Sequence, residues 1–78
     1  MNRFDKELIC IGEKVRKLRK QKKFSQEELA AQVEVSVMTI SRIESGSTLM
    51  NIQTLIRLSE VLETSPEDIL CRDMVKTW

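Results

Sequence analysis

The sequence predicts an all-α fold, a compact arrangement of five helices, and three observations support this prediction. The chain of 78 residues has only two glycines and one proline, a composition that favours helices over strands. Apolar residues recur at steps of three and four, the spacing that lines one face of a helix. Ser or Asn residues precede several of these stretches, where helix N-caps are expected. The length fits a single domain.

The first predicted helix runs from about residue 5 to residue 22 and has one continuous apolar face. That face comprises Phe4, Leu8, Ile11, Val15 and Leu18. Gly12 lies inside this helix, where glycine costs about 1 kcal/mol relative to alanine. We therefore expect another helix to approach closely at Gly12.

A second helix is predicted to begin at Gln26, because the residues around it have the pattern of a capping box. The Ser25 hydroxyl can accept from the amide of Glu28, whose carboxylate can reach back to the amide of Ser25. The predicted inner face of this helix consists of Leu29, Ala30 and Val33. The helix should end near residue 33, since residues 34–36 offer a turn.

Ser36 is the predicted N-cap of a third helix that covers residues 37–45. Ile40 and Ile43 supply its buried face. The helix should stop at Gly46, because glycine is best suited to a left-handed C-terminal cap.

Two further helices complete the predicted fold. Asn51 is a plausible N-cap for a helix that reaches about Glu63, and Ser65 with Pro66 begins a short fifth helix. The residues expected to face the core from these two helices are Ile52, Leu55, Leu58, Ser59, Leu62, Ile69 and Leu70.

The net charge of +1 conceals a strong asymmetry along the chain. Residues 1–24 carry nine basic and three acidic side chains, whereas the rest of the chain is acidic in balance. The basic block comprises Lys14, Arg16, Lys17, Arg19, Lys20, Lys22 and Lys23. Such a block is either a solvated helix face or a surface that faces an anion, and the charges alone favour neither.

Several classes of function lack their usual sequence signatures. The chain has no His, no Cys-x-x-Cys and no glycine-rich phosphate loop, so we expect no metal site, no cofactor, no small-molecule ligand and no enzymatic activity. No apolar run is long enough to cross a membrane, and the first residues lack the apolar core of a secretory signal. These features predict a cytoplasmic protein with no membrane association.

The two cysteines, Cys10 and Cys71, are expected to be reduced and to occupy core or half-buried positions. They could close a long loop, but a cytoplasmic setting keeps thiols reduced, and two cysteines do not form a framework. Basic neighbours of Cys10 give only weak support for a redox role.

Two short helices joined by a tight turn, 26–33 and 37–45, have the dimensions of a helix-turn-helix. Several segments closely resemble the Cro/repressor-type, or xenobiotic-response-element (XRE), family of transcriptional regulators. These segments are IGEKVRKLR at 11–19, SQEELA at 25–30, VS at 35–36, TISRIESG at 39–46 and the stretch 52–62. The resemblance implies a lambda-repressor-like DNA-binding domain over 10–70, with an extension of the first helix at 1–9 and a tail at 71–78.

The third helix would then be the one that enters the major groove of operator DNA. Residues that lie off its Ile40 and Ile43 face point outward and can read bases. The predicted base contacts are Val37, Met38, Ser41 and Arg42. Arg42 can donate two hydrogen bonds to a guanine, and the apolar side chains can meet a thymine methyl group.

Other residues are expected to contact the DNA backbone and so position the protein without reading sequence. They are Lys22, Lys23, Gln26, Glu27, Ser36, Thr39, Ser45, Ser47 and Thr48. Gln26 resembles the glutamine of the family that bonds the backbone and supports the recognition helix. The amides of Gln26 and Glu27 can also hold a phosphate at a helix N-terminus.

Arg19 and Glu44 resemble the ion pair with which the family links the first helix to the end of the third, here called the brace. Two departures from the family pattern are visible. Glu34 occupies a turn position usually held by glycine, so it must either adopt a left-handed conformation or change the turn. The loop after Gly46 offers hydroxyls in place of cations, which predicts a weaker salt dependence of binding.

Four apolar residues exceed what the inner face of the fourth helix requires: Leu49, Met50, Ile56 and Val61. In the family, dimers commonly form through this region, and exposed apolar clusters mark contacts. The alternative is single apolar residues scattered over the surface, which are normal. We favour a homodimer.

The sequence thus predicts a regulator of transcription that binds a double-stranded operator, with repression as the favoured direction. A protein-interaction module on the same fold, such as an antitoxin, is the alternative. That alternative requires the apolar surface at 49–61 to bind another protein.

Overall fold

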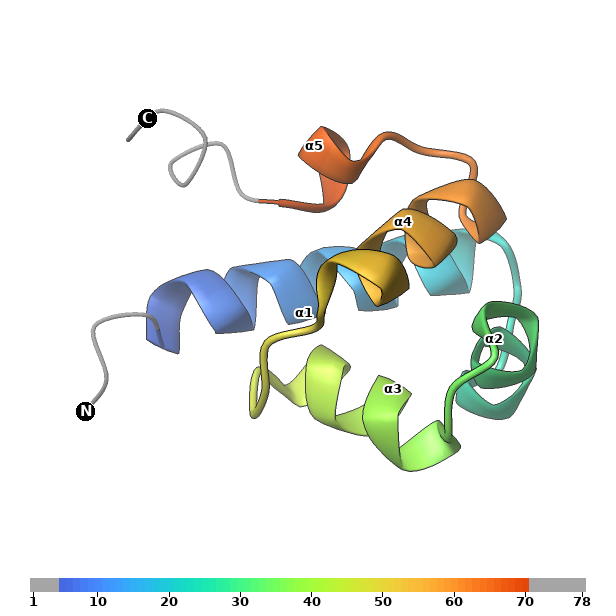
Figure 1. Ribbon diagram of the computed structural model, residues 1–78, viewed down its shortest axis with the longest axis horizontal. Helices are drawn as coiled ribbons and strands as arrows, with labels where there is room; N and C mark the ends of the chain where they lie inside the picture. Colours follow the sequence, from blue (N-terminus) through green and yellow to red (C-terminus); the bar gives the residue numbers. More distant parts are fainter. Residues whose placement is uncertain (1–4, 71–78) are drawn as a thin grey trace.

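The computed structural model describes residues 5–70, and within this range it contains five α-helices and no strand. They are α1 (Asp5–Gln21), α2 (Gln26–Val33), α3 (Val37–Ser45), α4 (Ile52–Val61) and α5 (Pro66–Ile69). In Figure 1, α1 runs across the molecule with α3 on one side of it and α4 and α5 on the other, while α2 lies at one end. The predicted all-α fold is confirmed.

Each of the helices α2 to α5 begins at the N-cap that the sequence predicts. Ser25, Ser36, Asn51 and Ser65 all have extended backbones and accept from the amide three residues ahead. The predicted capping box is complete, since the amide of Glu28 donates to Ser25 Oγ (3.0 Å) and the amide of Ser25 donates to Glu28 Oε1 (2.8 Å). Local hydrogen bonding therefore fixes where these helices start.

The turn between α2 and α3 keeps its glutamate in a left-handed conformation. Glu34 has φ 61° and ψ 44°, and its amide bonds the carbonyls of Ala30 and Ala31 at the end of α2. Of the two possibilities left open by the sequence, the chain adopts the strained backbone. Gly46 ends α3 in the same region of backbone space, with φ 77°, as predicted.

The core forms where the apolar stripes of all five helices meet. Its buried hydrophobic residues are Ile11, Val15, Leu29, Ala30, Val33, Ile40, Ile43, Leu55, Leu58, Leu62 and Ile69. Leu18, Phe24 and Leu70 are half-buried against this cluster. Phe4, predicted for the same face as Leu18, lies outside the described residues.

Gly12 marks the closest approach between α1 and α3. A Cβ atom at this position would lie 2.6 Å from the carbonyl oxygen of Glu44 and even nearer to that of Ile43. No side chain fits there, and the expected close approach of a second helix is confirmed. The last turn of α3 is thus seated directly on the backbone of α1.

The structure corrects the prediction for the beginning and the end of α4. Ile52, expected to face the core, is 69% exposed, while Thr54 is buried in the same turn. Ile52 is the first residue of the helix, beyond the reach of the neighbouring helices. The helix ends at Val61 and not near Glu63, because Glu63 turns left-handed with φ 55°.

The expectation for the cysteines is wrong at Cys10, which is exposed on α1 and takes part in a disulfide bond. That expectation rested on the inferred cellular compartment, which says nothing about whether two sulfur atoms lie within bonding distance. Cys71 lies outside the described residues.

Among residues 5–70 no helix is both long and apolar enough to cross a membrane.

Candidate nucleic-acid interface

One face of α3 packs against the core, and its outer face points away from it. Ile40 and Ile43 are almost completely buried, so residues that lie off the Ile40 and Ile43 face of α3 point away from the core. Val37 is 43% exposed and Met38 is 56% exposed, although both are apolar. Arg42 is exposed as well, whereas Ser41 is half-buried. Three of the four predicted base contacts, Val37, Met38 and Arg42, are therefore exposed on α3.

The first turn of α3 is held by two hydroxyl groups. Ser36 Oγ accepts from the amide of Thr39 at 3.1 Å and lies 2.9 Å from Thr39 Oγ1. Ser36 is exposed and Thr39 is half-buried. Both predicted backbone contacts thus lie together at the N-terminus of α3.

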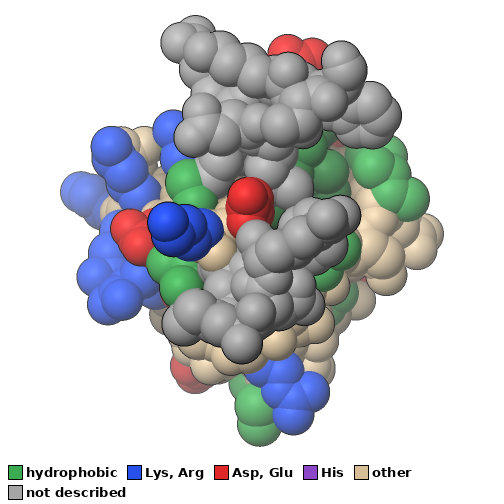
Figure 2. Space-filling model, turned by 90° about the vertical axis from the view of Figure 1, so that its left-hand side faces the viewer, with side chains coloured by type: hydrophobic (Ala, Val, Ile, Leu, Met, Phe, Trp, Pro, Cys, Tyr) green, Lys and Arg blue, Asp and Glu red, His purple; other side chains and the backbone are tan. Residues whose placement is uncertain are grey.

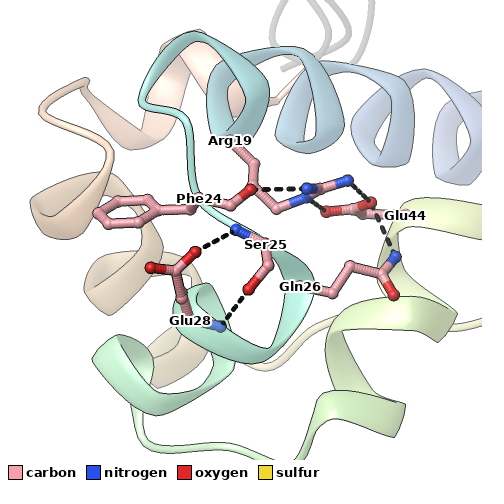
Figure 3. A network of polar contacts seen from close by, with 6 residues as sticks. All are labelled: Arg19, Phe24, Ser25, Gln26, Glu28 and Glu44. Carbon is pink, nitrogen blue, oxygen red and sulfur yellow. Dashed lines mark hydrogen bonds and ion pairs between the residues drawn. The ribbon is translucent and has the colours of Figure 1, made fainter.

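The brace forms (Figure 3), and both of its side chains are largely buried. Arg19 Nε donates to Glu44 Oε2 at 2.6 Å, and Arg19 Nη2 donates to Oε1 at 3.1 Å. Arg19 Nη1 donates to the carbonyl of Phe24 at 2.8 Å. The two side chains are only 11% and 4% exposed. Such a two-pronged pair between buried groups fixes the angle between α1 and α3.

Gln26 joins the same network from the start of α2. Its Nε2 donates to Glu44 Oε1 at 3.1 Å, so three helices meet at one carboxylate (Figure 3). This contact links the start of α2 to the end of α3. Glu27, the next predicted backbone contact, is exposed in the first turn of α2.

The two lysines before α2 point to different partners. Lys22 Nζ lies 2.6 Å from Glu63 Oε1, beyond the end of α4. The hydrogen bond and the charge of Lys22 lower the pKa of the Glu63 carboxyl. Lys23 is exposed and has a left-handed backbone with φ 62°. Of these two lysines, Lys23 alone has no ion pair with a described residue.

The loop after α3 carries the remaining predicted backbone contacts. Ser45 Oγ donates to the carbonyl of Arg42 at 3.0 Å and lies 2.7 Å from Ser47 Oγ. Ser45 and Ser47 are exposed, and Thr48 is half-buried. The hydroxyls form a small polar group at the C-terminal end of α3.

The residues predicted to form a dimer interface differ in exposure. Leu49 is 64% exposed and Ile56 is 47% exposed, whereas Met50 and Val61 are half-buried against the core. Ile52, which the sequence assigned to the core, joins the exposed group. Its place at the first position of α4, directly after the N-cap, is the signal that could have identified it.

Comparison with known proteins places these features in a wider group. A family model described as helix-turn-helix matches residues 15–69. Repressor protein C2 of Salmonella phage P22 is 37% identical over 67 residues, which cover 86% of this chain and 31% of the phage protein. The HTH-type transcriptional regulator DicA of Escherichia coli K12 is 37% identical over 65 residues, which cover 83% of this chain and 48% of DicA. The chain therefore spans less than half the length of either relative.

Solved structures show the same fold. The P22 c2 repressor in complex with synthetic operator 9T superposes with a TM-score of 0.75 and 38% identity, over 77% of this chain and 91% of that chain. Hydroxypropylphosphonic acid epoxidase from S. wedmorenis superposes with a TM-score of 0.78 over 86% of this chain but only 36% of that chain, at 22% identity. At that identity the likeness shows the fold alone.

Proposed function

The chain belongs to the helix-turn-helix family, and from this premise we propose that it is a sequence-specific DNA-binding regulator of transcription. The observation that carries the proposal is the accessible outer face of α3, held in place by the brace. A rigid, exposed helix of this size fits the major groove of B-DNA. The domain responsible covers residues 10–70, with residues 1–9 and 71–78 as its extension and tail.

The chemistry of the α3 face supports direct recognition of bases. Arg42 can donate two parallel hydrogen bonds to O6 and N7 of a guanine, the commonest specific contact in the major groove. Val37 and Met38 offer apolar contact to a thymine methyl group, which accounts for their exposure. Ser41 can donate to or accept from several base edges.

Further residues near this face are proposed to contact the DNA backbone. We propose this role for Lys23, Gln26, Glu27, Ser36, Thr39, Ser45, Ser47 and Thr48. Lys22 can join them only by giving up Glu63, and an exposed ion pair of this kind is easily exchanged for a phosphate.

Repression is the direction of regulation that we propose. One of the two relatives, the P22 repressor, is a repressor by name, and its solved structure is a complex with synthetic operator DNA. A protein that covers an operator blocks other proteins from the same DNA without further machinery. The proposed partner is double-stranded DNA, and we propose that the protein acts in the cytoplasm.

We further propose that the protein binds its operator as a homodimer through Leu49, Met50, Ile56 and Val61. The exposure of Leu49 and Ile56 supports this role, because exposed apolar clusters mark contacts. Two copies related by a two-fold axis would place two α3 helices one helical turn of DNA apart.

The same apolar surface favours a second candidate function, an antitoxin-like module that binds another protein. In that case DNA binding would be weak or absent, and the exposed Leu49, Ile52 and Ile56 would face the partner. We propose no enzymatic activity and no cofactor for either candidate, since the two relatives are regulators by name.

The experiment that tests the proposal is selection of bound duplexes from a random DNA pool at two salt concentrations, followed by sequencing. We expect an enriched inverted repeat with half-sites about one helical turn apart. Binding that is weak, sensitive to salt and without sequence enrichment would contradict the proposal and favour the protein-interaction module.

A further inference from the structure

A polar pocket opens between α1, the start of α2 and the outer side of α3. Its volume is about 270 Å³. The residues that line it are Arg16, Arg19, Gln26, Ser41, Glu44 and Ser45. The pocket therefore adjoins the α3 face that we propose reads bases, on the side that carries α1.

The charges in the pocket leave one cation unbalanced. Arg19 and Glu44 neutralise each other in the brace. Arg16 is exposed on α1 and forms no ion pair or hydrogen bond with any residue from 5 to 70. The Ser41 hydroxyl is half-buried and is likewise without a hydrogen bond to the described residues. The pocket thus combines a net positive charge with polar side chains that can donate.

Apart from Arg16 itself and Arg19, which is paired in the brace, the cations of the basic block do not line the pocket. Lys17 follows Arg16 in the chain and is exposed, but it does not line the pocket. Lys22 is paired with Glu63. Figure 2 shows several Lys and Arg side chains at the left of the face in view, with others near its centre and at its lower edge. Arg16 and Arg19 are the members of the block that line the pocket, and of these two only Arg19 forms an ion pair with a described residue.

We propose that this pocket binds a phosphodiester group of the DNA backbone, with Arg16 as the residue that supplies the charge. The inference rests on the proposed function. A guanidinium is suited to this ligand, because its planar fork of donors matches two phosphate oxygens. A phosphate beside α3 is expected, since the DNA backbone borders the groove that the helix would enter. Ser41 also lines the pocket and can donate to the same group, whereas the Ser45 hydroxyl already donates to the carbonyl of Arg42.

The first test compares Arg16→Ala with the matched control Lys17→Ala. Both remove one exposed positive charge from α1, so neither should unfold the chain. Affinity for the selected duplex is measured over a series of salt concentrations. For Arg16→Ala we expect affinity to fall about tenfold, with the salt slope reduced by about 0.9 and the preferred sequence unchanged. The control should change both quantities much less.

The second test identifies the phosphate. Each phosphate of the selected duplex is ethylated in turn, which removes its charge, and binding of the native chain and of Arg16→Ala is compared. In each half-site of the operator we expect one phosphate, next to the bound α3. Its ethylation should weaken binding of the native chain but not of Arg16→Ala. Competition with inorganic phosphate at constant ionic strength shows whether the pocket instead takes a free anion; displacement of the duplex at low concentrations would overturn the assignment to DNA.

The other outcomes are distinct. Equal effects of Arg16→Ala and Lys17→Ala would show that only the overall charge matters, and would overturn the pocket as a site. A changed sequence preference in Arg16→Ala would make Arg16 a base contact. A native chain that binds no duplex would overturn the proposed function and this site together, whereas native binding that Arg16→Ala leaves unchanged would overturn this site alone.

Discussion

The orientation of α3 depends most directly on Glu44. It accepts hydrogen bonds from Arg19 on α1 and from Gln26 on α2, and it is almost entirely shielded from water. A buried ion pair adds little net stability, but removal of one member leaves a buried charge without a partner. The brace therefore acts mainly as a device for positioning.

Glu44→Ala is expected to destabilise the chain by about 3 to 5 kcal/mol, because Arg19 loses its partner in a largely buried site. The free energy of unfolding from urea titration measures this loss. Arg19→Met with Glu44→Leu is the control, since an apolar replacement of both members should recover most of the stability. A double-mutant cycle with a coupling energy near zero would show that the two side chains do not act together.

Arg42→Ala is expected to cost about 1 to 3 kcal/mol of specific binding and to relax the preference at one base pair. The reason is the loss of a paired contact with one base, while the exposed position leaves the fold intact. Repeated selection from the random pool measures the change. Val37→Ala is the comparison variant on the same face. Site selection unchanged by Arg42→Ala would contradict a role in base recognition.

Individual contacts are predictable from sequence only where a pattern encodes them. The pair of Arg19 and Glu44 follows from the family resemblance, and the capping box follows from the order of its residues. The pairing of Lys22 with Glu63 could not be predicted, since it depends on how α1 and the end of α4 lie in space. The pocket beside Arg16 depends equally on three-dimensional packing.

At the scale of the elements, the turn between α2 and α3 carries strain that the sequence makes visible. Glu34 holds a left-handed backbone in which a Cβ atom is unfavourable, at a cost of about 1 kcal/mol or more. Lys23 and Glu63 share this conformation at two other helix junctions. Glycine is absent from all three positions, so the chain accepts the strain three times.

Glu34→Gly is expected to stabilise the chain, by less than about 1 kcal/mol. Relief of the left-handed strain is partly offset by the greater freedom that glycine gives to the unfolded chain. The midpoint of thermal unfolding measures the gain. Ala31→Gly, at an exposed position of α2, is the control and should lower the free energy of unfolding by about 1 kcal/mol. A loss of stability in Glu34→Gly would mean that the glutamate side chain contributes more than its backbone costs.

The starts of helices were easier to predict than their ends. Starts are set by a Ser or Asn side chain and an amide three residues away, which is a local interaction. The end of α4 depends on the left-handed turn at Glu63, for which no glycine gives a signal. The exposure of Ile52 depends on where the neighbouring helices stop, and apolar periodicity does not contain that information.

At the scale of the whole molecule, one surface ion pair connects the end of α1 with the segment between α4 and α5. The hydrogen bond and charge of Lys22 lower the pKa of Glu63 below its ordinary value of 4.5. A carboxyl whose pKa is lowered in the folded state stabilises that state above its ordinary value, and this contribution is lost as the pH falls through the lowered pKa. The connection should therefore weaken only in acid.

Glu63→Gln is expected to lower the midpoint of thermal unfolding slightly near neutral pH and to have no effect in strong acid, where the native carboxyl is already protonated. Thermal unfolding at several pH values from about 7 to about 3 measures the difference. Glu67→Gln is the control, because Glu67 is exposed and forms no ion pair within the described chain. An equal difference between Glu63→Gln and the native chain at every pH would exclude this ion pair as its cause.

The two glycines of the chain bear on how new DNA specificities can arise on this scaffold. Gly12 leaves no room between α1 and the backbone of residues 43 and 44, and Gly46 turns against Ile9. Both contacts lie at the last turn of α3, so neither involves the outward residues at positions 37, 38, 41 and 42. These four residues can therefore be exchanged together, by evolution or by design, while the contacts at Gly12 and Gly46 that hold α3 stay the same. A library restricted to them should yield folded variants with new operators.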